Sequence, residues 1–332
     1  MPRVHDIIYS ASSSELCLNH KYGTTTTQFE RLFLKDFKVS VPATTANLGP
    51  GLDCLGMAID LWNRVEVRAG GSGIKICGEG KEILGNDKTN LVYVGFRIAH
   101  ETIGMPLTPV GMTCENSIPL SRGLGSSAAA IVSGLIAGNL VCGEKLTTED
   151  ILKLATKIEG HPDNVAPAML GGCQIVVSDN DHLITSTVPI PTTLHAVMFI
   201  PDSPVPTREG RAVLGGAVAR VDAVYNLGRV ALLINTLQNN DLSHLDAATK
   251  DRLHQPARQR VFPAMKNIMD AARDAGAMGV FLSGSGSTIL ALASTKELTI
   301  GYEMADAASK SGVDGTIKIA PPTNIGAHVD FV

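Results

Sequence analysis

The sequence lacks the features that mark membrane proteins and nucleic-acid-binding proteins. No apolar run among its 332 residues approaches the ~20 needed to span a bilayer. Lysine and arginine number 28 against 32 acidic residues, and the net charge of −4 provides no basic surface for nucleic acid or anionic lipid. The length suits two domains, and 44% hydrophobic with 18% charged residues is typical of a soluble globular protein.

Paired cysteines are absent as well. The cysteines are scattered, with no C-x-x-C pair, and so they indicate neither a zinc site nor a disulfide framework. We interpret them as small reduced residues of an intracellular protein. The sequence also contains no internal repeat.

The common phosphate-binding motifs are missing, yet one segment has their physical ingredients. In IPLSRGLGSSAAA (118–130), two glycines bracket a turn and two serines run into a small-residue helix. Glycine allows close backbone approach, and the first N–H groups of a helix have no intrahelical partner. With the helix dipole they favour a phosphate, and the serine hydroxyls are within reach of a hydrated Mg²⁺. The alternative is an ordinary strand–turn–helix junction.

Two familiar phosphate loops are excluded in detail. A Walker A loop needs lysine directly after its last glycine, but Ser126 follows Gly125. The Rossmann fingerprint is matched only loosely by Gly123, Gly125 and Ala128, and no acidic residue closes a strand about twenty residues later. Arg122 is either a cation near the phosphates or a solvent-facing side chain.

The regular pattern begins only after residue 35. Residues 1–35 contain serine and threonine tracts without periodicity and predict a flexible leader, with a targeting segment as the alternative. Prolines 189 and 191 place a domain boundary near residue 190, which gives domains at 36–190 and 191–332. In the second, strands and helices alternate around a strand–glycine loop–strand segment, which predicts an α+β sandwich of ferredoxin-like type. The last predicted element is a strand at 315–319.

Thr89 and Asn90 predict the start of an amphipathic helix. Its apolar face is expected to carry Val94, Ile98 and Ile103.

A glycine-rich loop at 42–56 contains two polar residues with binding chemistry. Asn47 offers a donor and an acceptor, and Asp53 offers a carboxylate for a substrate ammonium or hydroxyl group. The alternative is a structural Asx-turn.

The segment EGHPDN (159–164) places four polar side chains within six residues. Glu159 suits Mg²⁺, which takes one or two carboxylates together with phosphate oxygens and water. Asp163 has the chemistry to accept a hydroxyl proton. His161 is interpreted as a hydrogen-bonded histidine, because its spacing from Glu159 is not that of a zinc site.

Two arginines follow in the second half. Thr207 and Arg211 are four residues apart and share a face if helical, and Arg258 belongs to the segment HQPAR (254–258). Arginines bind carboxylates or phosphates bidentately, although either one taken alone is interpreted first as a solvated surface charge. The segment SGSGS (283–287) is a tight turn or a small-residue ledge for a ligand.

Taken together these motifs resemble the homoserine kinase family of the GHMP kinases, over the chain from about Phe37 to Val329. The most discriminating of them is EGHPDNVAPA (159–168) with its following Gly-Gly pair. One motif would be weak, but several in register are strong. The other matching segments are PATTANLGPGLD (42–53), PLSRGLGSSAA (119–129), Thr207 with Arg211, PAR (256–258) and NIGA (324–327). Departures are Leu52 where the family commonly has Phe, Ser287 where Pro is frequent, and Arg122 where many members have Gly.

The resemblance implies an α+β GHMP kinase fold with a ribosomal-S5-like N-terminal domain, a ferredoxin-like C-terminal domain and the site between them. It implies ATP-dependent, Mg²⁺-assisted transfer of a phosphoryl group directly to the side-chain hydroxyl of L-homoserine, a step toward threonine. A homodimer is the usual expectation for the family. A bacterial-type enzyme would be cytoplasmic, and an algal or plant enzyme would be plastid-targeted through the leader.

The resemblance also implies roles by matched position. Ser127 and Glu159 would hold Mg²⁺, and Asp53 would meet the ammonium of homoserine while the arginines meet its carboxylate. Asp163 matches the position of the base in mevalonate kinase, but phosphoryl transfer depends mainly on positioning and charge, so Mg²⁺ and geometry come first. The catalytic residues implied are Asp163 and Arg211. The triphosphate residues implied are Pro119, Leu120, Ser121, Arg122, Gly123, Leu124, Gly125, Ser126, Ser127, Ala128 and Ala129. The homoserine residues implied are Asn47, Asp53, His161, Asn164, Thr207, Arg211 and Arg258.

Three alternatives remain open. Another small-molecule GHMP kinase, such as mevalonate or phosphomevalonate kinase, is disfavoured by the arginine pair, which suits an amino-acid carboxylate. A non-catalytic ATP sensor is disfavoured by the presence of Ser127 and Glu159. An ATP-using decarboxylase of the same superfamily is the third.

Overall fold

The structure is a computed structural model that describes residues 35–180, 182–203 and 207–332, without the side chains of 207–209. The predicted leader lies almost entirely outside the described residues. Among those described, no helix is both long and apolar enough to cross a membrane.

The described strands and helices alternate along the chain, as the sequence pattern predicts. In the N-terminal half they are β1 (Phe37–Ala46), β2 (Leu55–Ala69), β3 (Ile74–Gly78), α2 (Leu91–Ile103), β4 (Val110–Asn116), α3 (Ser126–Val141), α4 (Thr148–Glu159), α5 (Val165–Leu170), β5 (Cys173–Asp179) and β6 (His182–Val188). In the C-terminal half they are β7 (His195–Pro201), α6 (Thr207–Ala212), α7 (Arg220–Gln238), η2 (Leu242–His244), α8 (Leu245–Ala248), α9 (Gln255–Arg258), α10 (Met265–Asp274), β8 (Gly279–Leu282), β9 (Ile289–Ala293), α11 (Glu297–Lys310), β10 (Gly315–Ala320) and β11 (His328–Phe331).

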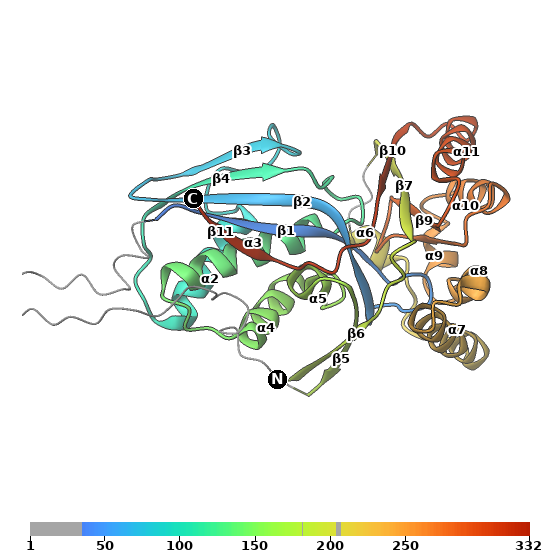
Figure 1. Cartoon of the computed structure of the whole chain (residues 1–332), viewed down its shortest axis with the longest axis horizontal. Helices are drawn as coiled ribbons and strands as arrows, with labels where there is room; N and C mark the ends of the chain where they lie inside the picture. Colours follow the sequence, from blue (N-terminus) through green and yellow to red (C-terminus); the bar gives the residue numbers. More distant parts are fainter. Residues whose placement is uncertain (1–34, 181, 204–206) are drawn as a thin grey trace, which may run out of the picture.

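Two sheets organise these elements. The first has the order β11-β1-β2-β4-β3, with β5 pairing β2 and β6 pairing β5, and the second has the order β10-β7-β9-β8. In the second sheet a strand–helix–strand–strand–helix–strand succession gives the spatial order 4-1-3-2, which confirms the predicted ferredoxin-like arrangement. Figure 1 shows α2 to α5 on one face of the first sheet and α10 and α11 on the outer face of the second.

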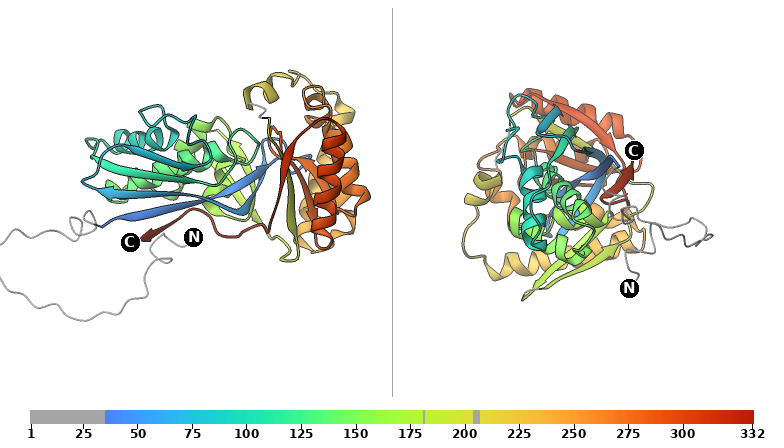
Figure 2. Two further views of the ribbon diagram at one scale, coloured as in Figure 1. Left: turned by 90° about the horizontal axis from the view of Figure 1, so that it is seen from above. Right: turned by 90° about the vertical axis from the view of Figure 1, so that its left-hand side faces the viewer.

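The prediction that the chain closes with the strand at 315–319 is wrong. The chain continues into β11, which pairs antiparallel with β1, with Phe37 opposite Phe331 and Ser40 opposite His328. The left view of Figure 2 shows this last strand returning beside the first one. The end of the chain therefore completes the first sheet, and the division at residue 190 stays a prediction.

Helices α2 and α3 approach each other closely because glycines line their contact. A Cβ on Gly134 would lie 2.0 Å from the Val92 carbonyl oxygen, and one on Gly95 would lie 2.5 Å from the Ile131 carbonyl oxygen. The predicted apolar face of α2 is only partly correct, because Ile98 packs against the core but the fully buried positions are others. Its buried residues include Val92 and Phe96, whereas Val94 and Ile98 are only half-buried. The predicted cap is correct, because the Asn90 side chain accepts from the Val92 N–H.

This packing gives a stability prediction. Gly134→Ala is expected to lower the free energy of unfolding by about 2–3 kcal/mol, because the two helices must move apart. Gly228 on α7 is the matched control, since a Cβ there would meet no atom within 4 Å. Gly228→Ala is expected to raise stability by about 0.5–1 kcal/mol through helix propensity. Urea unfolding followed by circular dichroism measures both, and equal effects of the two changes would contradict the packing argument.

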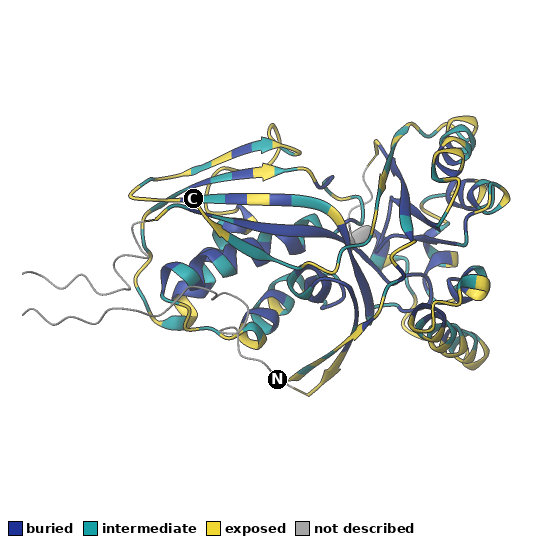
Figure 3. Ribbon diagram, viewed as in Figure 1, coloured by how far each residue is buried: buried dark blue, intermediate teal, exposed yellow. Residues whose placement is uncertain are grey.

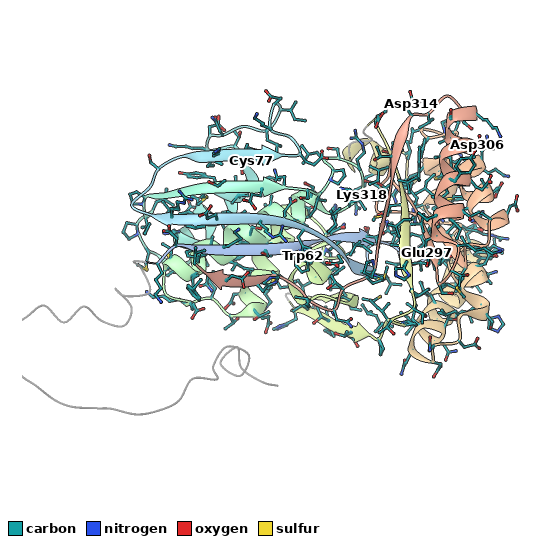
Figure 4. All side chains as sticks on the ribbon, turned by 45° about the horizontal axis from the view of Figure 1, so that its top comes forward. Trp62, Cys77, Glu297, Asp306, Asp314 and Lys318 are labelled. Atoms are coloured by element: carbon teal, nitrogen blue, oxygen red, sulfur yellow. The ribbon has the colours of Figure 1, made fainter. Side chains whose placement is uncertain are left out.

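The core lies between the first sheet and its helices and continues into the second sheet. Figure 3 shows β1 and much of α3 buried, while the outward sides of α7 and α11 are exposed. Contacts also join the two halves directly. The Lys318 ammonium, labelled on β10 in Figure 4, donates to the Ser117 carbonyl at 3.3 Å, just before the predicted phosphate loop. The two halves therefore meet beside that loop.

Candidate active site

The predicted phosphate loop leads directly into α3. The helix begins at Ser126, and Gly125 caps it with a φ of 69°, a conformation that favours glycine. The first backbone hydrogen bond of this turn runs from the Ala129 N–H to the Gly125 carbonyl. The three preceding N–H groups therefore have no acceptor within the helix, as an anion site requires.

The end of β1 and the loop between β8 and β9 hold the phosphate loop in place. The Thr44 N–H donates to the Leu124 carbonyl at 3.1 Å, which ties it to the end of β1. A Cβ on Gly123 would lie 2.1 Å from the Ser283 carbonyl oxygen, so only glycine allows the loop between β8 and β9 to approach this closely. The Ser283 hydroxyl donates to Gly123, 2.6 Å away. The segment 283–287 is thus a wall of the site.

Arg122 lines the cavity, and backbone carbonyls hold its guanidinium. Its Nε donates to the Pro201 carbonyl at 2.6 Å, one Nη donates to Leu120, and the other donates to Asp202. The guanidinium therefore joins the phosphate loop to the end of β7, and burial lowers its pKa.

Ser127 and Glu159 meet at the end of the phosphate loop. The Ser127 Oγ lies 2.5 and 2.6 Å from the two carboxylate oxygens of Glu159, the last residue of α4. Burial raises the pKa of Glu159, and the Ser127 hydrogen bond opposes that shift. This hydroxyl–carboxylate pair supplies the hard oxygen ligands that suit Mg²⁺. The described residues contain no cluster of three metal-binding side chains, so phosphate oxygens and water would complete the coordination shell.

Asp53 and Arg211 form an ion pair across the site. The two Nη atoms of Arg211 donate to the two carboxylate oxygens of Asp53 at 2.5 and 3.2 Å. Asp53 has a φ of 60°, and Asn47 fixes this loop by accepting from the Asp53 N–H at 3.0 Å. The Asn47 amide also donates to the Gly284 carbonyl at 3.0 Å. The site thus presents a negative and a positive group side by side.

Arg258 is a second cation, and it is only 2% exposed. Its Nε donates to the Gly210 carbonyl at 3.0 Å, and one Nη donates to Gly284 at 2.8 Å. Burial, with a further contribution from Arg211, lowers its pKa to about 10. Among the described residues no carboxylate lies within ion-pair distance of Arg258. A buried guanidinium held by neutral acceptors is prepared for an incoming anion.

The segment after α4 supplies the remaining polar groups. Burial, reinforced by the charge of Asp53, raises the pKa of Asp163 to about 7. His161 Nδ1 lies 3.7 Å from an Asp163 oxygen, and burial lowers the pKa of that histidine. Asn164 accepts from the Thr44 hydroxyl at 2.8 Å, which anchors the segment to β1.

The raised pKa of Asp163 makes stability depend on pH. The folded state holds this proton more tightly than the unfolded state, in which the pKa of an aspartate is near 3.8, so stability falls as pH rises toward about 7. Asp163→Asn removes this penalty. Relative to the unsubstituted protein, the variant is therefore expected to gain about 2 kcal/mol between pH 5 and pH 8. Urea titrations at both pH values test this, and parallel changes in the two proteins would contradict the assigned pKa.

These groups line one cavity between the two halves, as the sequence predicts. It brings together Asn47, Pro119, Ser121 to Ser127, Glu159, His161, Asp163, Asn164, Arg211, Arg258, Gly284 and Ser285. Asp53 reaches it through Arg211. Ala128 and Ala129 are buried beneath the loop, and Leu120 is not among the lining residues. Thr207 begins α6, but its side chain lies outside the described residues.

Sequence reasoning missed two contributors to this cavity. Gly284 and Ser285 belong to the segment interpreted as a ledge, yet neither was selected as a site residue. Their signal was the run of small residues between two buried strands.

The class follows from the fold, the loop and two family matches. The family model described as GHMP kinases N terminal domain matches residues 90–172, and the model described as GHMP kinases C terminal matches residues 226–311. A crystal structure of mevalonate kinase from L. major shares the fold, with a TM-score of 0.66 at 17% identity, covering 86% of this chain and 96% of that chain. The predicted GHMP kinase fold is therefore confirmed.

The similarity to one branch of this class is closer. Homoserine kinase of Moorella thermoacetica is 41% identical over 292 residues, which are 88% of this chain and 99% of that protein. A crystal structure of homoserine kinase from Cytophaga hutchinsonii has a TM-score of 0.80 and 30% identity, covering 94% of this chain and all of that chain. The chain belongs to the homoserine kinase family.

Proposed function

We propose that this protein phosphorylates the side-chain hydroxyl of L-homoserine with ATP, forming O-phospho-L-homoserine and ADP. The observation that carries the proposal is the juxtaposition of Asp53, Arg211 and the buried Arg258 beside a helix-terminal phosphate loop. This is the charge pattern of an amino acid next to a nucleotide. The family relationship supports the same reaction.

The two charged groups of the amino-acid substrate would each bind a group of opposite charge in the site. Its ammonium would replace Arg211 on one side of Asp53, and its carboxylate would bind Arg211 and Arg258. Asn47, His161 and Asn164 line the same cavity and supply donors and acceptors for the substrate. Mevalonate has no ammonium to take the place of Arg211 at Asp53, so Arg211 would have to pair with Asp53 and the substrate carboxylate together, which disfavours that substrate.

The triphosphate would lie on the N–H groups at the start of α3, within the loop Pro119 to Ala129. Ser127 and Glu159 are the residues that would hold Mg²⁺, and the ion would neutralise charge developing between the phosphates when bound. The fixed amides and the two side chains position the terminal phosphate toward the homoserine cavity. Such positioning supplies most of the rate in phosphoryl transfer.

Asp163 would take the proton of the substrate hydroxyl. Its pKa of about 7 means that a substantial fraction is ionised at neutral pH, and it is also close to the pH at which it works. We propose this as a secondary contribution, after the positioning of the phosphate. Arg211 would stabilise negative charge in the same cavity.

The proposal is tested by measuring ADP release by the purified protein with Mg·ATP and, separately, L-homoserine, mevalonate and galactose. Turnover is expected with L-homoserine alone. Turnover with mevalonate alone would overturn the assignment of Asp53, Arg211 and Arg258 to the charged groups of an amino acid. Tight ATP binding without turnover would favour a sensor. In a separate assay that offers a diphosphorylated hydroxy acid, release of CO₂ would favour a decarboxylase. We also propose a cytoplasmic homodimer, and analytical ultracentrifugation tests the dimer.

A further inference from the structure

A series of buried, hydrogen-bonded polar groups lies behind Asp53, Arg211 and Arg258 and is not part of the proposed chemistry. At its centre His254, which is completely buried, lies with Nδ1 2.8 Å from an Nη of Arg258. Its other ring nitrogen, Nε2, lies 2.7 Å from the Gly49 carbonyl oxygen. The imidazole thus joins the cation in α9 to the loop that carries Asp53.

These two contacts define one protonation state of the ring. A carbonyl can only accept a hydrogen bond, so Nε2 must carry the hydrogen that points to Gly49. An arginine can only donate, so Nδ1 must present its lone pair to Arg258. The ring is therefore neutral with its hydrogen on Nε2. Burial, with an added contribution from the Arg258 charge, lowers the pKa of His254 to about 4, although the neighbouring Asp251 opposes the shift.

The backbone around His254 is fixed by the Asp251 carboxylate. The carboxylate accepts from the backbone N–H groups of Leu253 at 2.9 Å, His254 at 3.0 Å and Gln255 at 2.7 Å. It also accepts from the Asn226 amide at 2.7 Å, and that amide donates to the Pro50 carbonyl as well. His254 and Asn226 therefore hold adjacent carbonyls of the same loop.

We propose that His254 is a positioning residue for the substrate carboxylate: its Nδ1 acceptor fixes the guanidinium of Arg258 so that the remaining N–H groups of that guanidinium face the cavity. His254 does not line the cavity, so it acts only through Arg258. The identity of the substrate rests on the proposed function.

Two nearly isosteric substitutions separate the two hydrogen bonds of the ring. In His254→Asn the amide oxygen takes the place of Nδ1 and keeps an acceptor for Arg258, but the donor to Gly49 is lost. In His254→Gln the amide nitrogen reaches the Gly49 carbonyl, but the acceptor facing Arg258 is lost. The proposal therefore expects the Gln variant to have the larger defect, although it keeps the longer side chain.

The measurement compares L-homoserine with 3-aminopropan-1-ol, which has the same hydroxyl and ammonium groups but no carboxylate. In His254→Gln, kcat/KM for L-homoserine is expected to fall by about 10- to 100-fold, mainly through KM, because a hydrogen bond to a charged group is lost. For the aminoalcohol it is expected to change by less than about threefold, because that substrate does not use Arg258. Equal losses for both substrates, or an Asn variant as defective as the Gln variant, would overturn the proposal.

The tautomer can be measured in the unsubstituted protein, which avoids any folding defect of the variants. Long-range ¹H–¹⁵N spectra of protein labelled at histidine nitrogens are expected to show a neutral His254 with its hydrogen on Nε2. The resonance is assigned by its absence in His254→Asn, or in His254→Gln if only that variant folds. A hydrogen on Nδ1 would overturn the proposal. Absence of L-homoserine turnover in the unsubstituted protein would instead contradict the proposed function. The spectrum would still show whether Nδ1 of His254 is an acceptor for Arg258.

Discussion

Arg211→Ala is expected to lower kcat/KM for L-homoserine by about 100- to 1,000-fold, because it removes one partner of a charge cluster and leaves another unpaired. In the structure both Nη atoms of Arg211 donate to Asp53, so the variant loses the carboxylate contact and also leaves Asp53 uncompensated. The KM for Mg·ATP is expected to change by less than about threefold, since the phosphate loop is not altered.

Arg220→Ala is the matched control for this change. Arg220 is the first residue of α7, is exposed and does not line the cavity. Its removal is expected to leave both KM values unchanged. An Arg211 variant that weakens ATP and homoserine equally would contradict the carboxylate assignment and would place Arg211 on the phosphates.

Glu159→Gln is expected to lower kcat by about 1,000-fold at saturating substrates, because it removes the carboxylate that is proposed to hold Mg²⁺. Glutamine has nearly the same shape and can still accept from the Ser127 hydroxyl, so the fold around α4 should persist. Raising the Mg²⁺ concentration is expected to recover part of the activity. Chelation of Mg²⁺ by EDTA should abolish the activity of the unsubstituted protein.

A glutamate on the same helix provides the control for this change. Glu149, in the first turn of α4, is exposed and pairs with Lys153 at 2.8 Å. Glu149→Gln is expected to retain full activity and the same Mg²⁺ dependence.

Because the charge of Glu159 contributes to the raised pKa of Asp163, Glu159→Gln is also expected to lower the pH midpoint of any residual activity. Full activity of Glu159→Gln at low Mg²⁺ would contradict the metal assignment.

The parts of the site that depend on local sequence were predictable. The phosphate loop is continuous in the chain, and its glycines, serines and following helix are explained by the conformations that these residues permit. The link between Ser127 and Glu159 joins residues 32 positions apart, and only the family resemblance indicated it.

The errors occurred where a partner distant in the sequence decides the outcome. The glycines of α3 determine which face of α2 is buried, and the helical periodicity of the α2 sequence contains no information about them. The short strand β11 has no local signal beyond a brief alternation, and it exists because β1, almost the whole chain away, offers a free edge. Tertiary pairing decided both elements.

The arginines show the same limit within the site. Sequence reasoning left Arg211 and Arg258 open as surface charges, since neither spacing nor composition reveals burial. Arg258 is in fact enclosed by Gly210 and Gly284, which distant segments contribute, together with His254 four residues before it. Arg122 was equally ambiguous, and its three carbonyl acceptors come mainly from β7 and the residue after it.

The central claim is that the cavity between the two sheets transfers the terminal phosphate of ATP to an amino-acid hydroxyl. It is tested most directly by ³¹P NMR of a reaction that contains the purified protein, Mg·ATP and L-homoserine labelled with ¹³C at the hydroxyl-bearing carbon. The account predicts one new phosphomonoester signal, coupled to the labelled carbon and growing in step with ADP. ADP accompanied by inorganic phosphate alone, or a phosphate signal without coupling to that carbon, would contradict it.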